Sequence, residues 1–339
     1  MLNKIFFWIS VFVSLLGIAF CPCIMLFIEK YPFMIVPIGV GAVILMYVIL
    51  SALLWLLLIV VSWTVNKNKE YKKQSAFYGK LFAALYSNGV WWCGARVVVT
   101  GMEKLPDPKA GRFLFVSNHR SVFDTFIQAA ALWRYPLAFI SKPENFKIPI
   151  GNQFMRRCRY MAINRDNPRE GGMTIIKASE MIKSGDSCIG VYPEGTRNRT
   201  TDTLLRFRHG CFKAALWAKC PIVIGVVHNS AKIRPNWPKP TKVHFEIVEV
   251  LPYEAISGKK SNEISDLVRE KMLAHLDADD WTYDLKLKNI PEQQDAMEDR
   301  PNVEIAKAVA GNTEAVKTEP ADTKAADTES ATPAAETSN

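Results

Sequence analysis

The hydrophobic pattern marks two long apolar runs at the start of the chain. Residues 5–28 carry no charged side chain, and residues 31–63 form a second uncharged run of 33 residues. About 20 apolar residues in a helix cross the hydrocarbon core of a bilayer, and backbone in lipid must form its hydrogen bonds internally. The sequence therefore predicts a membrane hairpin of two apolar helices over residues 1–65, which either spans the bilayer or deeply enters it.

Residues 66–285 alternate between β-rich runs and runs with helical periodicity. The predicted strands cover residues 96–100, 113–117, 137–140, 160–163, 187–192, 222–227 and 243–250. The predicted helices cover residues 122–134, 144–157, 171–183, 210–219 and 262–277. This alternation favours one α/β domain with a largely parallel sheet covered by helices. Ligands on such sheets bind at the carboxyl ends of the strands, so residues that directly follow strands are the candidates for chemistry.

The end of the chain has a different composition. Residues 291–339 contain 11 Asp and Glu against 4 Lys and Arg, together with 11 alanines and no aromatic residue. Such a segment buries too little apolar surface to offset the entropy lost on ordering. The sequence therefore predicts an acidic, disordered tail over residues 286–339.

Charge indicates where the protein resides. The whole chain carries a net charge of +9, and lysines 67, 69, 72 and 73 directly follow the hairpin. Juxtamembrane lysines mark the cytoplasmic side, and seven cysteines without a pairing rhythm agree with a reducing compartment. No nucleic-acid recognition motif accompanies the positive charge, so membrane phospholipids are the better partner. We expect a protein of the cell membrane whose α/β domain faces the cytoplasm.

A histidine and an aspartate follow the predicted strand 113–117. His119 lies in the strand-to-helix turn, and Asp124 lies in the first or second turn of the helix, from where it can reach back. The carboxylate can accept from Nδ1–H of the imidazole and leave Nε2 free as a general base. The same spacing also fits a helix-capping aspartate beside a surface histidine. Taken alone, the spacing favours this second interpretation.

A Pro-Glu-Gly-Thr-Arg string follows the predicted strand 187–192. Gly195 permits close approach of the backbone to a ligand, and the planar fork of Arg197 suits phosphate oxygens. Glu194 could orient Arg197 or a substrate hydroxyl. A turn with a surface ion pair would also produce such a string.

Further cations follow other strands. Arg165 comes after the predicted strand 160–163, and Lys142 comes after the predicted strand 137–140. Together with Arg197 they suggest an anionic substrate. The remaining histidines 209, 228, 244 and 275 have no metal-ligand spacing, so no metal site is predicted.

Together these stretches resemble the glycerolipid acyltransferase family, in particular its bacterial 1-acyl-sn-glycerol-3-phosphate acyltransferases. Asn118-His119-x4-Asp124 is similar to the family's catalytic block, and Ile163-Asn164-Arg165 to its second block. The third is matched by Tyr192-Pro193-Glu194-Gly195-Thr196-Arg197, and the apolar fourth by Pro221-Ile222-Val223-Ile224. The resemblance covers roughly residues 75–255.

The resemblance implies transfer of an acyl group from an acyl-CoA or acyl carrier protein thioester to the sn-2 hydroxyl of lysophosphatidic acid, giving phosphatidic acid without a cofactor. It implies that His119 is the general base and that Asp124 orients it. It further assigns the glycerol phosphate to Arg165, Glu194, Gly195, Thr196 and Arg197, with Lys142 as a possible helper.

Two alternatives stay open at this stage. The enzyme could acylate another lysolipid, or the chain could be a non-catalytic binder of anionic lipids whose basic surface explains membrane attachment. An intact His/Asp pair weighs against the binder, because a binder has no use for a general base. Lipid hydrolysis is a third reaction class, but the sequence has no nucleophile motif for it.

Overall fold

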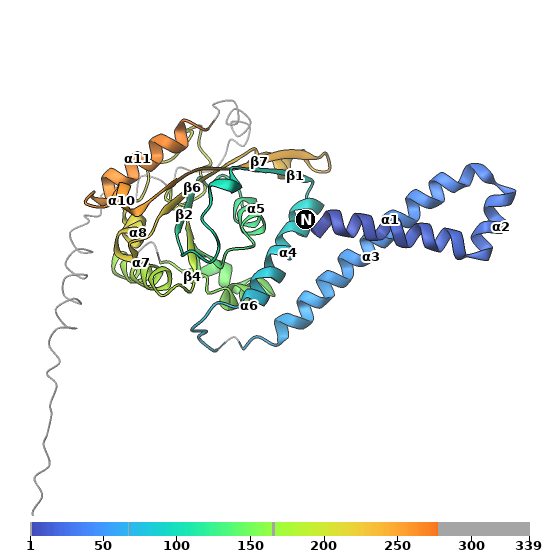
Figure 1. Ribbon diagram of the computed structural model, residues 1–339, viewed down its shortest axis with the longest axis horizontal. Helices are drawn as coiled ribbons and strands as arrows, with labels where there is room; N and C mark the ends of the chain where they lie inside the picture. The colour runs from blue at the N-terminus through green and yellow to red at the C-terminus, as the bar shows by residue number, and fades with distance from the viewer. Residues whose placement is uncertain (1, 67, 165–166, 277–339) are drawn as a thin grey trace, which may run out of the picture. The chain divides into compact units, whose positions relative to one another are not determined.

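The computed structural model describes residues 2–66, 68–164 and 167–276 of the 339-residue chain (Figure 1). The predicted acidic tail lies outside the described residues.

The first apolar run forms two helices. Helix α1 covers Leu2–Phe20 and helix α2 covers Pro22–Lys30, and their axes are bent by 79°. The prediction of one continuous helix over this run was wrong, because Pro22 has no backbone N–H and starts a new helix at its first position.

The second apolar run forms one long helix. A short 3₁₀ turn, η1 (Pro32–Met34), leads into α3, which covers Ile35–Trp63. Among the described residues, Pro32–Trp63 is the single unbroken helix long and apolar enough to cross a membrane, with a mean hydropathy of 3.0. Helix α1 packs along α3, so the two runs form a hairpin whose first arm is bent.

Helix α4 (Ala76–Trp92) follows the hairpin and was not among the predicted helices. It contacts α1 and α3 as well as the α/β domain. The ring of Tyr47 on α3 packs at a tilt against Trp91 with ring centroids 4.7 Å apart, and Asn88 donates to the Ser51 hydroxyl at 3.4 Å. Because α4 is covered on several sides, its sequence lacks the one-sided apolar pattern that marks a surface helix.

In the described part of the chain, seven strands form one sheet in the order β1-β7-β6-β2-β5-β3-β4. They are β1 (Ala95–Thr100), β2 (Leu114–Ser117), β3 (Leu137–Ser141), β4 (Met161–Ala162), β5 (Cys188–Val191), β6 (Ile222–His228) and β7 (Thr241–Leu251). Every neighbouring pair is parallel except β6 and β7, which are antiparallel. The predicted largely parallel α/β architecture is confirmed.

Helices flank the sheet (Figure 1). The layer that includes α4 also holds α5 (Phe123–Ala131) and α6 (Gly151–Arg157), both of which contact α4. The other elements are η2 (Met102–Lys104), η3 (Pro143–Lys147), α7 (Pro168–Lys183), η4 (His209–Phe212), α8 (Lys213–Ala218), η5 (Ser230–Lys232), α9 (Ile233–Asn236), α10 (Tyr253–Ile256) and α11 (Ser261–Leu273). Of these, α7, α8 and α11 contact one another or η4.

The predicted helix over 144–157 was wrong, because it is divided into η3 and α6. Pro149 lies between them and cannot donate a helical hydrogen bond. Ile150, the next residue, has a φ of 64°, which lies outside the helical region.

Interlocking aromatic rings fix the centre of the sheet. Phe115 on β2 makes edge-to-face contacts with Phe139 on β3 and Phe245 on β7, at centroid distances of 6.4 and 6.1 Å. Gly190 on β5 lies under Phe139, where an added Cβ would come within 2.6 Å of the ring. Such close packing makes the strand ends a rigid base for the loops that follow them.

Candidate active site

The described site residues follow adjacent parallel strands at one edge of the sheet. Strands β2, β5, β3 and β4 are neighbours in that order. His119 follows β2, Arg197 follows β5, and Lys142 directly follows β3. Arg165 lies outside the described residues, although β4, which ends three residues before it, ends at the same edge. The parallel register thus aligns the loops that the sequence singled out.

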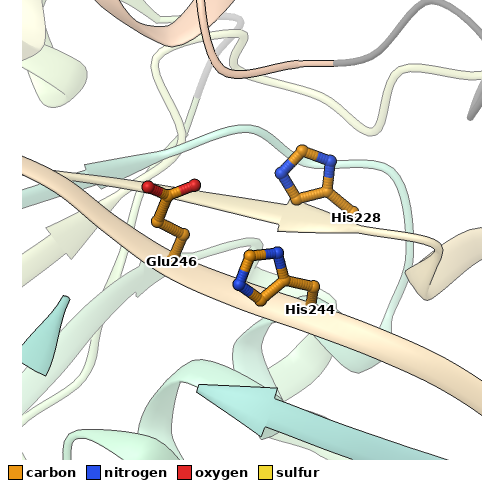
Figure 2. Close-up of side chains that lie close together, drawn as sticks. All are labelled: His228, His244 and Glu246. Atoms are coloured by element: carbon orange, nitrogen blue, oxygen red, sulfur yellow. The ribbon is translucent and has the colours of Figure 1, made fainter. Parts of the chain in front are cut away.

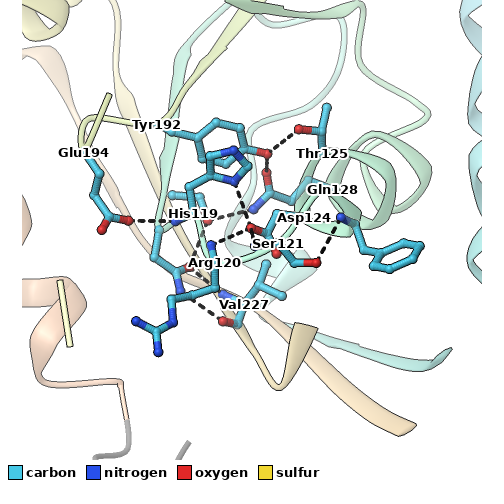
Figure 3. A network of polar contacts seen from close by, with 12 residues as sticks. His119, Arg120, Ser121, Asp124, Thr125, Gln128, Tyr192, Glu194 and Val227 are labelled. Atoms are coloured by element: carbon cyan, nitrogen blue, oxygen red, sulfur yellow. Dashed lines mark hydrogen bonds and ion pairs between the residues drawn. The ribbon is translucent and has the colours of Figure 1, made fainter. Parts of the chain in front are cut away.

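His119 and Asp124 are in direct contact (Figure 3). Nδ1 of His119 lies 2.9 Å from Oδ2 of Asp124. The same carboxylate oxygen accepts from the backbone N–H groups of Arg120 and Ser121, each at 2.7 Å. Asp124 is fully buried in the first turn of α5, where the helix N-terminus favours an anion. A carboxylate in this place keeps the proton on Nδ1, which leaves Nε2 with a free lone pair.

The ring of Tyr192 packs on the face of the His119 imidazole. The two rings stack with centroids 4.0 Å apart and planes 11° from parallel. The Tyr192 hydroxyl donates to Oε1 of Gln128 at 2.8 Å and lies 2.9 Å from the Thr125 hydroxyl, both on α5. Burial raises the pKa of Tyr192 well above its usual range, so the hydroxyl stays neutral. No spacing in the sequence indicated this support.

Asn118 ties the histidine turn to β6. Its side-chain amide donates to the carbonyl of Val227 at 3.0 Å, and its carbonyl oxygen accepts from the Val227 N–H at 2.8 Å. Both partners are buried. This two-way pairing behaves like one more rung of the sheet and fixes the backbone just before His119.

The side chain of Glu194 bonds to the backbone of the turn that carries His119. One carboxylate oxygen accepts from the backbone N–H of His119 at 2.7 Å, and the other accepts from the N–H of Leu205 at 3.0 Å. Glu194 is 3% exposed, and burial raises the pKa of its carboxyl group to about 7. Both oxygens bond to backbone, so the structure gives Glu194 a positioning role. The motif had predicted a contact with substrate or with Arg197.

The loop around Gly195 lies against the same turn. The N–H of Asn198 donates to the His119 carbonyl at 2.7 Å. Gly195 has a φ of +71°, and a Cβ there would come 2.5 Å from Nε of Arg208. The glycine is therefore required by its own backbone conformation and by the Arg208 side chain, which is a different reason from the ligand approach that the sequence suggested.

Arg197 is the half-buried cation of this loop. Burial and then the charge of Arg199 lower its pKa, while Asp124 acts in the opposite direction. A guanidinium under these conditions is stabilised by an incoming anion. Thr196, its neighbour, is exposed, as is Lys142 at the start of η3. These side chains are accessible to a ligand. His119 and Asp124, by contrast, are fixed by their mutual hydrogen bond and by the Tyr192 ring.

Comparison with known proteins points to the same family as the motifs. A family model described as Acyltransferase matches residues 96–227, which include His119, Asp124 and the Pro193–Arg197 string. The α/β domain is similar to the acyltransferase family over these residues. The resemblance inferred from the motifs is thus confirmed.

Relatives with assigned names come from several kingdoms. The chain is 24% identical over 191 residues to a 1-acyl-sn-glycerol-3-phosphate acyltransferase of Borreliella burgdorferi, covering 56% of this chain and 74% of that protein. It is 28% identical over 176 residues to the enzyme of that name from Escherichia coli K12, covering 49% of this chain and 69% of the relative. A chloroplastic Brassica napus relative, also a 1-acyl-sn-glycerol-3-phosphate acyltransferase, is 26% identical over 234 residues, covering 69% of this chain but 63% of that protein.

A solved structure has the same fold. The crystal structure of the 1-acyl-sn-glycerophosphate acyltransferase PlsC from Thermotoga maritima matches with a TM-score of 0.50 and 24% identity, covering 63% of this chain and 81% of that one. This likeness confirms the fold of the acyltransferase domain. The bacterial relatives and the apolar helix α3 together indicate association with a membrane.

Proposed function

We propose that this acyltransferase moves a fatty acyl group from a thioester to the sn-2 hydroxyl of lysophosphatidic acid, forming phosphatidic acid. The observation that carries the proposal is the His119–Asp124 pair, with Nδ1 held by the carboxylate and Nε2 free. The names of the relatives supply the substrate class.

In the proposed reaction the acceptor hydroxyl gives its proton to Nε2 of His119 while its oxygen attacks the thioester carbonyl. The new C–O ester bond forms, the C–S bond breaks, and the thiolate takes up the proton. Asp124 stabilises the imidazolium that exists between these steps. A positioned base of this kind accelerates a reaction by about 10²–10⁴-fold. Because the acceptor attacks directly, no acyl-enzyme and no serine nucleophile are needed.

We assign the phosphate of the acceptor to the cations at the strand ends. Arg197 offers a planar fork to phosphate oxygens. The motif resemblance adds Arg165 and Thr196, and Lys142, which follows β3, supplies a further cation. A monoester phosphate carries up to two negative charges near neutral pH, so it meets such cations more strongly than a diester lysolipid does.

The acyl donor is a thioester of coenzyme A or of acyl carrier protein, and the reaction uses no other cofactor. The membrane hairpin holds the site at the membrane surface, where lysophosphatidic acid and phosphatidic acid reside. We further propose that the domain faces the cytoplasm, because lysines 67, 69, 72 and 73 follow α3.

The proposal is tested with purified full-length protein in lipid or detergent. Lysophosphatidic acid, lysophosphatidylcholine and lysophosphatidylglycerol are each offered with acyl-CoA and with acyl carrier protein thioester, and products are resolved by mass spectrometry. We expect phosphatidic acid as the main product. Preferred acylation of a diester lysolipid would overturn the acceptor assignment, and thioester hydrolysis with no acyl transfer would overturn the reaction type.

A further inference from the structure

Two histidines and a glutamate from adjacent strands meet beside the antiparallel junction of the sheet. His228 ends β6 and lies directly opposite His244 on β7, and Glu246 follows two residues along on the same face of β7. One ligand atom from each side chain can be chosen so that all lie within 4.8 Å of one another. Figure 2 shows the three side chains rising from the same side of the two strands.

The two imidazoles are held close in a partly buried place. Their rings are nearly parallel, 18° apart, with centroids 5.5 Å from each other, and His228 is 7% exposed. Neutral imidazole nitrogens and a carboxylate oxygen are the donor set that zinc-class divalent metals take in proteins.

Neighbouring side chains orient this donor set as metal ligands are usually oriented. Nε2 of His244 lies 2.8 Å from the Thr100 hydroxyl on β1, so a ring that donates there presents its other nitrogen, Nδ1, as the free donor. His275, just beyond α11, lies 3.3 Å from Oε1 of Glu246, which leaves Oε2 available. Outer partners of this kind fix the tautomer and direction of ligating side chains.

We propose that His228, His244 and Glu246 form a binding site for a divalent transition metal of the zinc class. Shifts of about 1 Å in each side chain bring the three donors to the roughly 2.0–2.1 Å that zinc takes with nitrogen and oxygen ligands. Neither the family match nor the proposed reaction assigns a role to these residues. The site therefore stands independently of the proposed function.

The position of the site indicates what a bound ion does. Val227, the residue before His228, exchanges two hydrogen bonds with Asn118, and Asn118 precedes His119. An ion that joins the end of β6 to β7 holds the strand against which the histidine turn is braced. The proposed ion does not touch the catalytic pair, because its ligands are His228, His244 and Glu246 and His119 pairs with Asp124. Its role is therefore to stabilise the fold.

The test uses full-length protein without a histidine tag, stripped with a chelator and titrated with Zn²⁺ against a chromophoric competitor. We expect one Zn²⁺ per chain, a higher Tm with the ion, and no competition by Mg²⁺. His228→Ala and His244→Gln should each weaken binding by at least ~10-fold, and Thr100→Val should weaken it by about 10-fold. His209→Ala is the matched control, because its ring contacts Ser261 instead, and it should bind as the unaltered protein does.

X-ray absorption at the zinc edge reports the ligands directly and does not depend on how well a variant folds. We expect nitrogen and oxygen neighbours without sulfur. A sulfur shell, or binding that disappears when Cys21 and Cys23 are changed to serine, would place the ion at the cysteines and overturn the proposal. Absence of stoichiometric binding to the unaltered chain would overturn it as well.

Discussion

Oε1 of Glu194 accepts a hydrogen bond from the backbone N–H of His119 at 2.7 Å, across 75 residues of sequence. This contact joins the turn that carries the candidate general base to the loop that carries the candidate phosphate ligand. Oε2 accepts from the backbone N–H of Leu205 at the same time. One buried carboxylate therefore connects its own loop to the backbone at His119 and at Leu205.

Glu194 should give the protein a measurable pH dependence of stability. Burial raises its pKa from 4.5 to about 7, so between these values the folded state binds the proton more tightly than the unfolded state. Its contribution to the free energy of unfolding is therefore largest below about pH 4.5 and is lost as the pH rises towards 7. Glu194→Gln removes this titration.

The measurement is the Tm of both proteins between about pH 5 and pH 8. The Tm of the unaltered protein should fall more steeply with rising pH than that of Glu194→Gln, and groups that titrate in both proteins cancel in the difference. Glu194→Gln should also have the lower Tm below pH 6. Parallel curves for the two proteins would show that Glu194 does not titrate in this range.

Gly195→Ala should be destabilising for two separate reasons. The positive φ of +71° costs a residue with a side chain about 1–2 kcal/mol, and the new Cβ would collide with Arg208. Gly185→Ala is the matched control, since Gly185 has a φ of +72° but no atom within 4 Å of an added Cβ. We expect the larger loss of Tm, together with a lower kcat, in Gly195→Ala. Equal losses in both variants would mean that Arg208 yields freely.

Arg197 should act on the acceptor and not on the acyl donor. A charge-assisted hydrogen bond in a partly desolvated site contributes about 1.5–3 kcal/mol, so Arg197→Ala should lower kcat/KM for lysophosphatidic acid by ~10–150-fold. Arg197→Lys keeps the charge but loses the fork, and it should still be impaired. Arg199→Ala, which changes the exposed neighbour, serves as the control. Acceptor titrations at saturating donor measure the effect, and an increase confined to the donor KM would place Arg197 in the donor site.

The sequence predicted the features that depend on local pattern. All seven strands in the described residues were found because β-rich runs bounded by turn residues mark each one. The His119–Asp124 contact was accessible because the two residues lie five positions apart across a strand-to-helix turn. The break at Pro22 and the split at Pro149 were missed, although both follow from the missing N–H of proline. Helix α4 was missed because it is covered by the hairpin as well as by the domain.

Features that depend on register could not be predicted. The stacking of Tyr192 on His119 requires β2 and β5 to be neighbours, and nothing in the spacing of the two residues indicates this. Glu194 was expected to contact a ligand because the motif places it beside Arg197, yet its side chain turns to the backbone. The cluster of His228, His244 and Glu246 exists because β6 and β7 are antiparallel with His228 opposite His244, whereas their sequence spacing matches no metal motif.

The central claim is that His119 is the general base, and the turnover of His119→Ala tests it most directly. Lysophosphatidic acid and acyl thioester are supplied at saturation, and an unchanged Tm and retention in the membrane fraction show that the variant is folded. We expect the rate to fall by about 10²–10⁴-fold, which corresponds to roughly 3–5.5 kcal/mol of activation free energy, while His209→Ala keeps a rate near that of the unaltered protein. Near-normal turnover by folded His119→Ala would contradict the account.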